Sequence, residues 1–190
     1  MALNFIKKFF GPKAPDSGAL DIGSNTIKLC QVVGTANNLQ LFRFVTCPTP
    51  AAAIKDGAIM ESSSLGEAIR EMIAENNLSV KRVVTSVAGQ QVVIRPIPMP
   101  KMPPKELHQA IQFEAERYLP YSVTEAQVSG SIISEDAGDG KNMEVLLIAV
   151  PKEITEKTKL VISASGVETG AIDIEPLAIY RALKFSLDSE

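Results

Sequence analysis

The side chains best suited to chemistry in this 190-residue chain lie in one short stretch, LDIGSNTIKL, at residues 20–29. A carboxylate (Asp21), a glycine (Gly23) and an amine (Lys28) fall there between two apolar runs, which predicts a tight β-hairpin. Such a turn exposes consecutive N–H groups that can converge on phosphate oxygens, and glycine allows the close approach. The stretch therefore predicts a phosphate-binding loop. Its candidate cofactor-binding residues are Asp21, Gly23, Ser24, Asn25, Thr26 and Lys28.

Asp21 is also the candidate metal ligand. It lies near the end of the first expected strand, and one carboxylate is enough to hold a hydrated Mg²⁺, which keeps several of its waters. The competing interpretation is structural, because glycine and asparagine are ordinary turn residues. The chemistry of the residues leaves both interpretations open.

Two further groups of acidic residues have spacings found in phosphate loops or in acid–base pairs. A further Asp-x-Gly triplet, Asp136-Ala137-Gly138, falls in the acidic loop 135–142, which we expect to be long and solvated rather than a second phosphate loop. Asp173 and Glu175 are expected to alternate on one strand and to point the same way, as an acid–base pair would. Because no substrate pocket is evident, we favour a solvated strand end for this pair.

Histidine and cysteine are too few for several classes of site. His108 stands alone, which argues against a His-based metal site and a Ser-His triad. Cys30 and Cys47 form no CxxC, which argues against zinc and a disulfide. The net charge of −3 gives no electrostatic reason to expect nucleic acid.

The first layer of structure follows from periodicity. Three apolar runs, at 19–22, 26–33 and 39–46, predict an antiparallel meander. The third run is apolar on both faces, which indicates a sheet covered on both sides. A helix with Ser64 as N-cap and Glu67 as its capping-box partner follows.

The middle of the chain predicts an inserted α+β subdomain at 96–165, within an α/β subdomain formed by 18–95 plus 166–190. The insert begins with a proline-rich extended link at 96–104 and continues as a helix at 105–119. Two strands and a second helix complete it. In the 105–119 helix, Phe113 lies off the apolar stripe. It is therefore either part of a second contact surface or a residue that packs on the neighbouring lobe or on the proline-rich link. Glu114 lies within the stripe, where an ion pair is expected.

The N-terminal tail, 1–17, has an amphipathic start. As a helix it places Leu3, Ile6 and Phe10 on one side before Gly11-Pro12 ends it. Such a segment either rests on a membrane surface or a partner, or is a tail that packs locally or is disordered. No apolar run of the chain approaches the ~20 residues of a membrane span.

The phosphate-loop pattern Asp-x-Gly-Ser-x-x-x-Lys resembles the first phosphate loop of the actin-like ATPase superfamily, and Asp-x-Gly-Ser-Asn also resembles its exopolyphosphatase branch. Three downstream blocks, which begin "PIPMPKMPPKELHQAIQFEAERYLPY", "EVLLIAVPKE" and "IDIEPLAIYRAL", are similar in order and spacing to the PilM family, the actin-like cytoplasmic proteins of type IV pilus assembly. This similarity extends from about residue 20 to residue 183.

The resemblance implies an actin-like (ribonuclease H-like) α/β first lobe with the inserted α+β subdomain, and no second lobe. ATP with Mg is the cofactor in the intact family. Binding is expected to be weak or absent in this chain, which stops before a second Asp-x-Gly hairpin and an adenosine loop. The implied role is a non-enzymatic scaffold in the bacterial cytoplasm, at the cytoplasmic face of the inner membrane. The alternative is a nucleotide or polyphosphate hydrolase, of which this chain is the first lobe.

The resemblance also implies partners. The first is the N-terminal cytoplasmic peptide of a PilN-like single-span inner-membrane protein, held in a groove for which the candidate residues are Pro98, Met99, Pro100 and Phe113. Pilus motor or platform proteins are further candidates, and membrane contact is expected to be peripheral. An uncovered apolar face near residues 178–185 predicts self-association.

Overall fold

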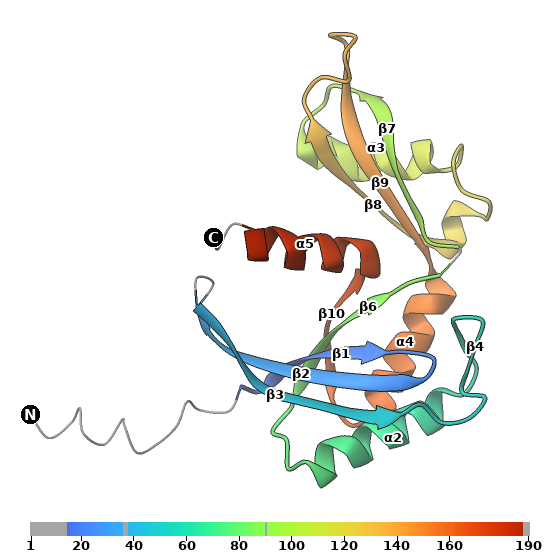
Figure 1. The fold of residues 1–190 in the computed structure, drawn as a ribbon. Coiled ribbons are helices and arrows are strands. Elements are labelled where there is room, and N and C mark those ends of the chain that lie inside the picture. The colour runs from blue at the N-terminus through green and yellow to red at the C-terminus, as the bar shows by residue number, and fades with distance from the viewer. Residues whose placement is uncertain (1–14, 36–37, 90, 188–190) are drawn as a thin grey trace, which may run out of the picture. The chain divides into compact units, whose positions relative to one another are not determined.

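The computed structural model describes residues 15–35, 38–89 and 91–187, and residues 1–14 of the expected tail lie outside them. These residues form two compact units (Figure 1). The first comprises the described chain up to Val87 and from Lys157 onward, and the second comprises Ala88–Glu156. From the sequence we expected divisions after residues 95 and 165.

The first unit is built on a five-stranded sheet with the order β10-β6-β1-β2-β3. The strands β1, β2 and β3 form the antiparallel meander that the sequence predicts, and β6 and β10 run parallel to β1. Their bounds are β1 Ser17–Ile22, β2 Thr26–Thr35, β3 Asn38–Pro48, β6 Arg82–Val87 and β10 Glu168–Ile174. A small hairpin, β4 (Ile54–Lys55) and β5 (Ala58–Ile59), leads from β3 to the first helix.

Two helices, α2 (Ser62–Glu75) and α4 (Lys152–Ala164), pack against one face of this sheet. The apolar stripes of the helices meet alternate strand residues there, because side chains in a strand point to the two faces in turn. The buried cluster includes Leu20, Ile27, Leu29, Leu65, Ile69, Met72, Val83, Val161 and Ile162.

The start of α2 differs from the prediction. The helix begins at Ser62 after Glu61, and no side chain caps it. Ser64 is already inside the first turn, so its hydroxyl donates to the carbonyl of Glu61 (3.1 Å), as serine often does within a helix. Glu67 pairs with Arg70 and does not close a capping box.

The opposite face of the sheet, here called the open face, is only partly covered. The prediction that β3 is covered on both sides was wrong, because Leu41 and Phe44 are 64% and 55% exposed. The last helix, α5 (Glu175–Leu187), lies on this side next to β10 and β6 (Figure 1). Among the described residues of the first unit, no helix lies over β1, β2 and β3 on the open face.

The second unit is a three-stranded antiparallel sheet with the order β7-β9-β8, and α3 packs on one of its faces. Its elements are β7 Val93–Pro100, α3 Pro104–Ala115, the 3₁₀ helix Val123–Glu125, β8 Ala126–Ser134 and β9 Asn142–Pro151. The buried cluster between α3 and the sheet centres on Ile97, Met99, Ile111, Val145 and Leu147.

Two details of this unit differ from the sequence prediction. The prolines at 96, 98 and 100 do not form a link but belong to β7, paired with β9 from Val93 to Pro100. Proline is tolerated there because β7 is an edge strand, where its missing N–H can face away from the neighbour. The helix α3 ends at Ala115 rather than at residue 119, and residues 116–118 form a turn.

Candidate functional site

The predicted phosphate loop forms a hairpin in which Asp21 and Lys28 are direct cross-strand partners. Lys28 Nζ lies 2.6 Å from Asp21 Oδ2, and both side chains project from the open face, each about half exposed. The amine that was expected to neutralise a phosphate is thus already neutralised by the aspartate of its own loop. A phosphate group would compete with this carboxylate for Lys28.

The turn between the two strands is held by a close backbone contact at Gly23 and by hydrogen bonds from Thr49. A Cβ atom on Gly23 would lie 2.8 Å from the carbonyl oxygen of Thr26, so only glycine fits without a shift of the backbone. Thr49, which follows β3, donates its hydroxyl to the carbonyl of Gly23 (2.6 Å) and its N–H to the carbonyl of Asn25 (3.1 Å). Ser24 and Asn25 remain exposed at the tip. The sequence contained no signal for the role of Thr49.

Asp21 belongs to a polar row at the carboxyl ends of the parallel strands. The last paired residues of β1 and β6 are Leu20 and Thr85, so Asp21 and Ser86 come next on the two strands. Ser86 in turn pairs with Asp173 on β10. By strand alternation all three side chains lie on the open face. Ligands of open α/β sheets bind at this end of the strands, yet sequence reasoning had not connected these residues.

Asp173 and Glu175, for which we favoured a solvated strand end over an acid–base pair, do not lie on one strand. Glu175 is the first residue of α5, so it does not alternate with Asp173 along β10. Asp173 instead accepts hydrogen bonds from Arg181 of α5 and, at 2.9 Å, from the N–H of Ile174. The proline that follows Glu175 suits the first turn of a helix, and it was the sequence signal that a helix, not a strand, begins at Glu175.

The residues of the hairpin fit one phosphate group in part. Lys28 supplies a cation, and the exposed Ser24 and Asn25 supply hydrogen-bond donors at the tip. Asp21 is a single carboxylate, and the described residues contain no group of three His, Cys, Asp or Glu side chains that could hold a metal ion. Any Mg²⁺ here would therefore keep most of its waters and share Asp21 with Lys28.

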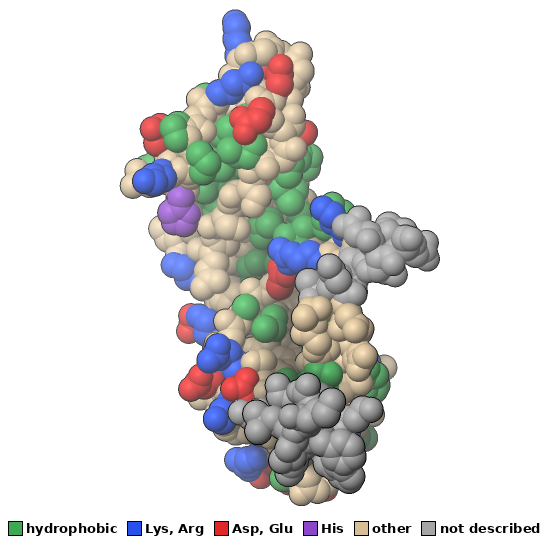
Figure 2. Space-filling view, turned by 90° about the vertical axis from the view of Figure 1, so that its left-hand side faces the viewer, with side chains coloured by type: hydrophobic (Ala, Val, Ile, Leu, Met, Phe, Trp, Pro, Cys, Tyr) green, Lys and Arg blue, Asp and Glu red, His purple; other side chains and the backbone are tan. Residues whose placement is uncertain are grey.

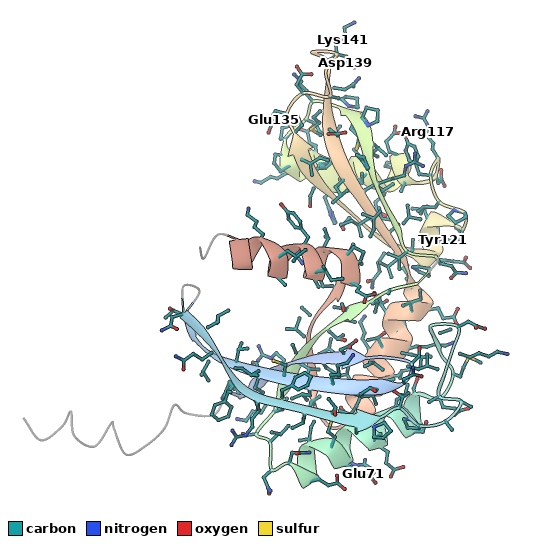
Figure 3. All side chains as sticks on the ribbon, in the orientation of Figure 1. Glu71, Arg117, Tyr121, Glu135, Asp139 and Lys141 are labelled. Carbon is teal, nitrogen blue, oxygen red and sulfur yellow. The ribbon has the colours of Figure 1, made fainter. Side chains whose placement is uncertain are left out.

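The Asp136-Ala137-Gly138 triplet lies in a long, exposed loop, as expected, and the tip of this loop carries Asp139 and Lys141 (Figure 3). Asp136 Oδ1 accepts the N–H groups of Gly138 (2.9 Å) and Gly140 (3.0 Å), which lower the pKa of this carboxyl. Asp139 accepts two further backbone N–H groups in the same way, and its pKa is lowered for the same reason. The loop uses these donors internally, so they are not free for a phosphate.

The four candidate groove residues do not lie on one surface. Met99 is 1% exposed and packs in the core with α3, whereas Pro98 and Pro100 project from the other face of the sheet. Phe113 projects from α3 and is 78% exposed, so it does not pack on the proline-containing strand. Glu114 beside it pairs with Arg117 (3.1 Å), the ion pair that its position predicted.

The face of the second unit opposite α3 carries an apolar stripe that the sequence analysis missed. Pro96 is the cross-strand partner of Leu146, and Ile94 is the partner of Ile148. Leu146 and Ile148 are half-buried, while Pro96 and Pro98 are exposed. The signal was the uninterrupted run LLIAV in β9, because a strand with apolar residues on both faces needs cover on both.

The cysteines show no sign of reactivity. Cys30 and Cys47 are free and half-buried. Burial raises the pKa of both thiols, and Glu75 and Glu71 raise the pKa of Cys47 further. Both sites therefore favour the neutral thiol over the nucleophilic thiolate.

Among the residues that the structure describes, no helix has the length and apolar character needed to cross a membrane.

Comparison with known proteins assigns the chain to a family. The family model of the type IV pilus assembly protein PilM matches residues 19–189. The fold is similar to a solved PilM-PilN type IV pilus biogenesis complex, with a TM-score of 0.80 and 27% identity over 91% of this chain and 51% of that one. The chain thus spans about half the length of that relative. A weaker likeness, limited to the fold, links this chain to the cytoplasmic domain of EpsL, an inner-membrane component of the type II secretion system of Vibrio cholerae. The TM-score is 0.51 and the identity 12%, over 83% of this chain and 56% of that domain. The chain has the mixed α/β architecture of the PilM actin-like fold, and it belongs to the PilM family of type IV pilus assembly proteins.

Proposed function

We propose that this chain serves type IV pilus assembly as a scaffold in the bacterial cytoplasm, at the cytoplasmic face of the inner membrane. Its partner would be the N-terminal cytoplasmic peptide of a PilN-like single-span membrane protein. One observation carries the proposal: the likeness, at a TM-score of 0.80, to a chain from a PilM-PilN complex. The role is binding rather than catalysis, and pilus motor or platform proteins are further candidate partners.

The apolar stripe of the second unit is the surface that we assign to this peptide. Ile94, Pro96 and Pro98 on β7 and Leu146 and Ile148 on β9 offer apolar contacts in rows. An extended peptide lying on such a face places alternate side chains against it. The prolines add rigid apolar surface without side-chain entropy to lose.

The prolines of β7 disfavour a second binding mode, in which the peptide would pair with the edge of the sheet. A peptide that added to the sheet as a further strand would need N–H donors along the outer edge of β7. Proline at 96, 98 and 100 removes donors at every second residue, while Ile97 and Met99 between them keep theirs for β9. Strand addition at this edge is therefore disfavoured, and burial of apolar side chains would supply most of the affinity.

Nucleotide is the subject of a second, competing proposal. The hairpin with Asp21, Gly23 and Lys28 supports binding of ATP with Mg²⁺, and a nucleotide or polyphosphate hydrolase of which this chain is the first lobe is the alternative function. The pairing of Lys28 with Asp21 favours weak binding, because phosphate must displace the carboxylate. Calorimetric titration with ATP and Mg²⁺, with Asp21→Ala beside the unchanged chain, tests this proposal. Tight binding that the substitution abolishes would favour the hydrolase.

Peptide binding is tested by fluorescence anisotropy with the labelled N-terminal peptide of the PilN-like protein. Two variants separate the candidate surfaces: Pro98→Arg places a charge on the stripe, and Phe113→Ser removes an aromatic ring from α3 on the other side. We expect Pro98→Arg to raise the Kd at least tenfold and Phe113→Ser to leave it within twofold. The reverse pattern would move the site to α3, and no binding by the unchanged chain would contradict the proposal.

A further inference from the structure

The three strands of the second unit, which the structure describes throughout their length, carry two charged side chains, one on each face of the sheet. They are Arg95 of β7 and Glu144 of β9. Arg95 lies on the α3 side, where its Cζ is 4.7 Å from the centre of the Tyr118 ring. Glu144 alternates with Met143 and Val145 of the buried cluster, so its side chain lies on the opposite face. It stands there at one end of the apolar stripe, next to Leu146.

Glu144 has no counter-ion in the part of the chain that the structure describes, and its side chain forms no hydrogen bond there although it is partly buried. Its cross-strand neighbours are Pro98 and Ser134. Pro98 has no donor to offer, and Ser134 donates its hydroxyl to the carbonyl of Asp136 (2.7 Å). A carboxylate that loses water without gaining a donor is costly, so a cation brought by another molecule would stabilise it.

The charges at this end of the stripe are mostly negative. Carboxylates outnumber lysines by four to two, and these residues are Glu135, Asp136, Asp139, Glu144, Lys101 and Lys141. Figure 2 shows hydrophobic side chains at the surface of the second unit below a tip that carries charged ones. A partner that lies along the stripe therefore meets apolar surface and, at one end, negative charge.

We propose that the stripe selects its peptide partly by charge, and that Glu144 pairs with a Lys or Arg of that peptide. This inference rests on the proposed function, which assigns a peptide to the stripe. The apolar residues of the stripe attract any extended apolar segment, whereas a single charge at one end fixes the register and the direction of the segment. Glu144 is therefore a specificity-determining residue.

The spacing along β9 defines the pattern of the peptide. Glu144, Leu146 and Ile148 follow one another at every second residue, about 6.7 Å apart. A peptide that is extended alongside β9 has the same repeat, so three of its alternate side chains meet these residues in turn. The expected ligand thus has two apolar side chains two residues apart, and a Lys or Arg two residues beyond one of them.

Fluorescence anisotropy with the full 190-residue chain and the labelled N-terminal peptide of the PilN-like protein tests the pairing. Glu144→Gln keeps the shape of the side chain but removes its charge, and we expect it to raise the Kd about fivefold. The difference should shrink in about 0.5 M KCl, because salt screens the pair. Glu116→Gln is the matched control: Glu116 is exposed at the end of α3, which packs on the other face of the sheet, and its loss should leave the Kd within about twofold.

Variants of the peptide identify the residue that Glu144 contacts. Each Lys and Arg of the peptide is replaced by Gln in turn. For one of them, this replacement and Glu144→Gln together should weaken binding no more than either does alone, the sign of a direct pair. Glu144→Lys should then bind a peptide with Glu at that position within about threefold of the original affinity. A peptide that binds without any Lys or Arg, or additive effects at every basic position, would overturn the inference.

Leu146→Ala separates this inference from the proposed function. If the peptide does not bind the unchanged chain, both fail. If Leu146→Ala weakens binding and Glu144→Gln does not, the stripe remains the peptide site and selection by charge is overturned. Weaker binding in both variants, with the Glu116→Gln control unchanged, is the result that we expect.

Discussion

Lys28 and Asp21 face each other across the β1–β2 hairpin at 2.6 Å, so the phosphate-loop pattern contains its own counter-ion. Because the pair is half exposed, we expect Asp21→Asn and Lys28→Gln each to change the free energy of unfolding by less than about 1 kcal/mol in urea titrations.

Their effects on phosphate should be opposite. Asp21→Asn releases the Lys28 amine, so affinity for metal-free tripolyphosphate should rise about fivefold, equivalent to the ~1 kcal/mol of a solvated charge pair. Lys28→Gln should abolish that binding. Equal affinity of Asp21→Asn and the unchanged chain in calorimetry would mean that Lys28 does not contact the phosphate.

Gly66 of α2 permits the close contact between α2 and α4. A Cβ atom added at Gly66 would lie 2.4 Å from Ala164 Cβ and 2.9 Å from the carbonyl oxygen of Val161. Alanine improves helix propensity by about 1 kcal/mol, but overpacking costs ~1–3 kcal/mol, and contacts this short favour the upper part of that range. We expect Gly66→Ala to lower the free energy of unfolding by about 1–2 kcal/mol.

Two variants control this prediction in thermal or urea unfolding. Glu71→Ala, at an exposed position of α2 (Figure 3), should change stability by less than about 0.5 kcal/mol. Ala164→Gly combined with Gly66→Ala should recover part of the loss, because it removes the opposing methyl group. Independent, additive effects of the two substitutions would show that the contact between them is not the cause.

Tyr121 links two parts of the second unit. Its hydroxyl donates to the carbonyl of Gln91 (2.8 Å) and lies 3.3 Å from that of Ala149. We expect Tyr121→Phe to lower the free energy of unfolding by about 1 kcal/mol at neutral pH.

The effect of Tyr121→Phe should depend on pH with a defined sign. Burial raises the pKa of Tyr121, because the phenolate is less well solvated there. The stabilisation of the fold by the Tyr121 hydroxyl is therefore complete below the pKa of tyrosine in the unfolded chain, about 10, and is lost as the pH rises through the higher pKa of Tyr121 in the folded chain. Urea titrations between pH 7 and 11 should show the difference between the unchanged chain and the variant shrink above pH ~10. A constant difference would contradict the raised pKa.

Asp136 should order its loop only while it is ionised. The N–H groups of Gly138 and Gly140 lower its pKa, so the ordering is complete above the unfolded pKa of about 3.9 and is lost as the pH falls through the lower folded value. The amide signals of both glycines should titrate together in NMR spectra between pH 2 and 6. Asp136→Ala should remove that titration and speed amide exchange at both glycines.

The sequence was sufficient for the local elements. The apolar runs at 19–22, 26–33 and 39–46 predicted the meander, and the Asp-x-Gly turn at 21–23 predicted the hairpin, because pairing between neighbouring strands and the steric freedom of glycine depend on nearby residues. The proline-containing strand β7 was misjudged for the complementary reason: whether proline is tolerated depends on which edge faces the neighbouring strand, and residues 93–100 do not specify that edge.

By itself, then, the sequence determined the meander, the inserted α+β unit and the family resemblance, all of which rest on spacing along the chain. The tertiary structure decided which side chains meet. It paired Lys28 with Asp21, aligned Asp173 with Ser86, and left Phe44 and Leu183 uncovered. Asp173 and Ser86 are distant in sequence, whereas Lys28 and Asp21 meet through the register of one hairpin. These relations depend on register and layer order, which arise only when the apolar faces of separate elements are buried together.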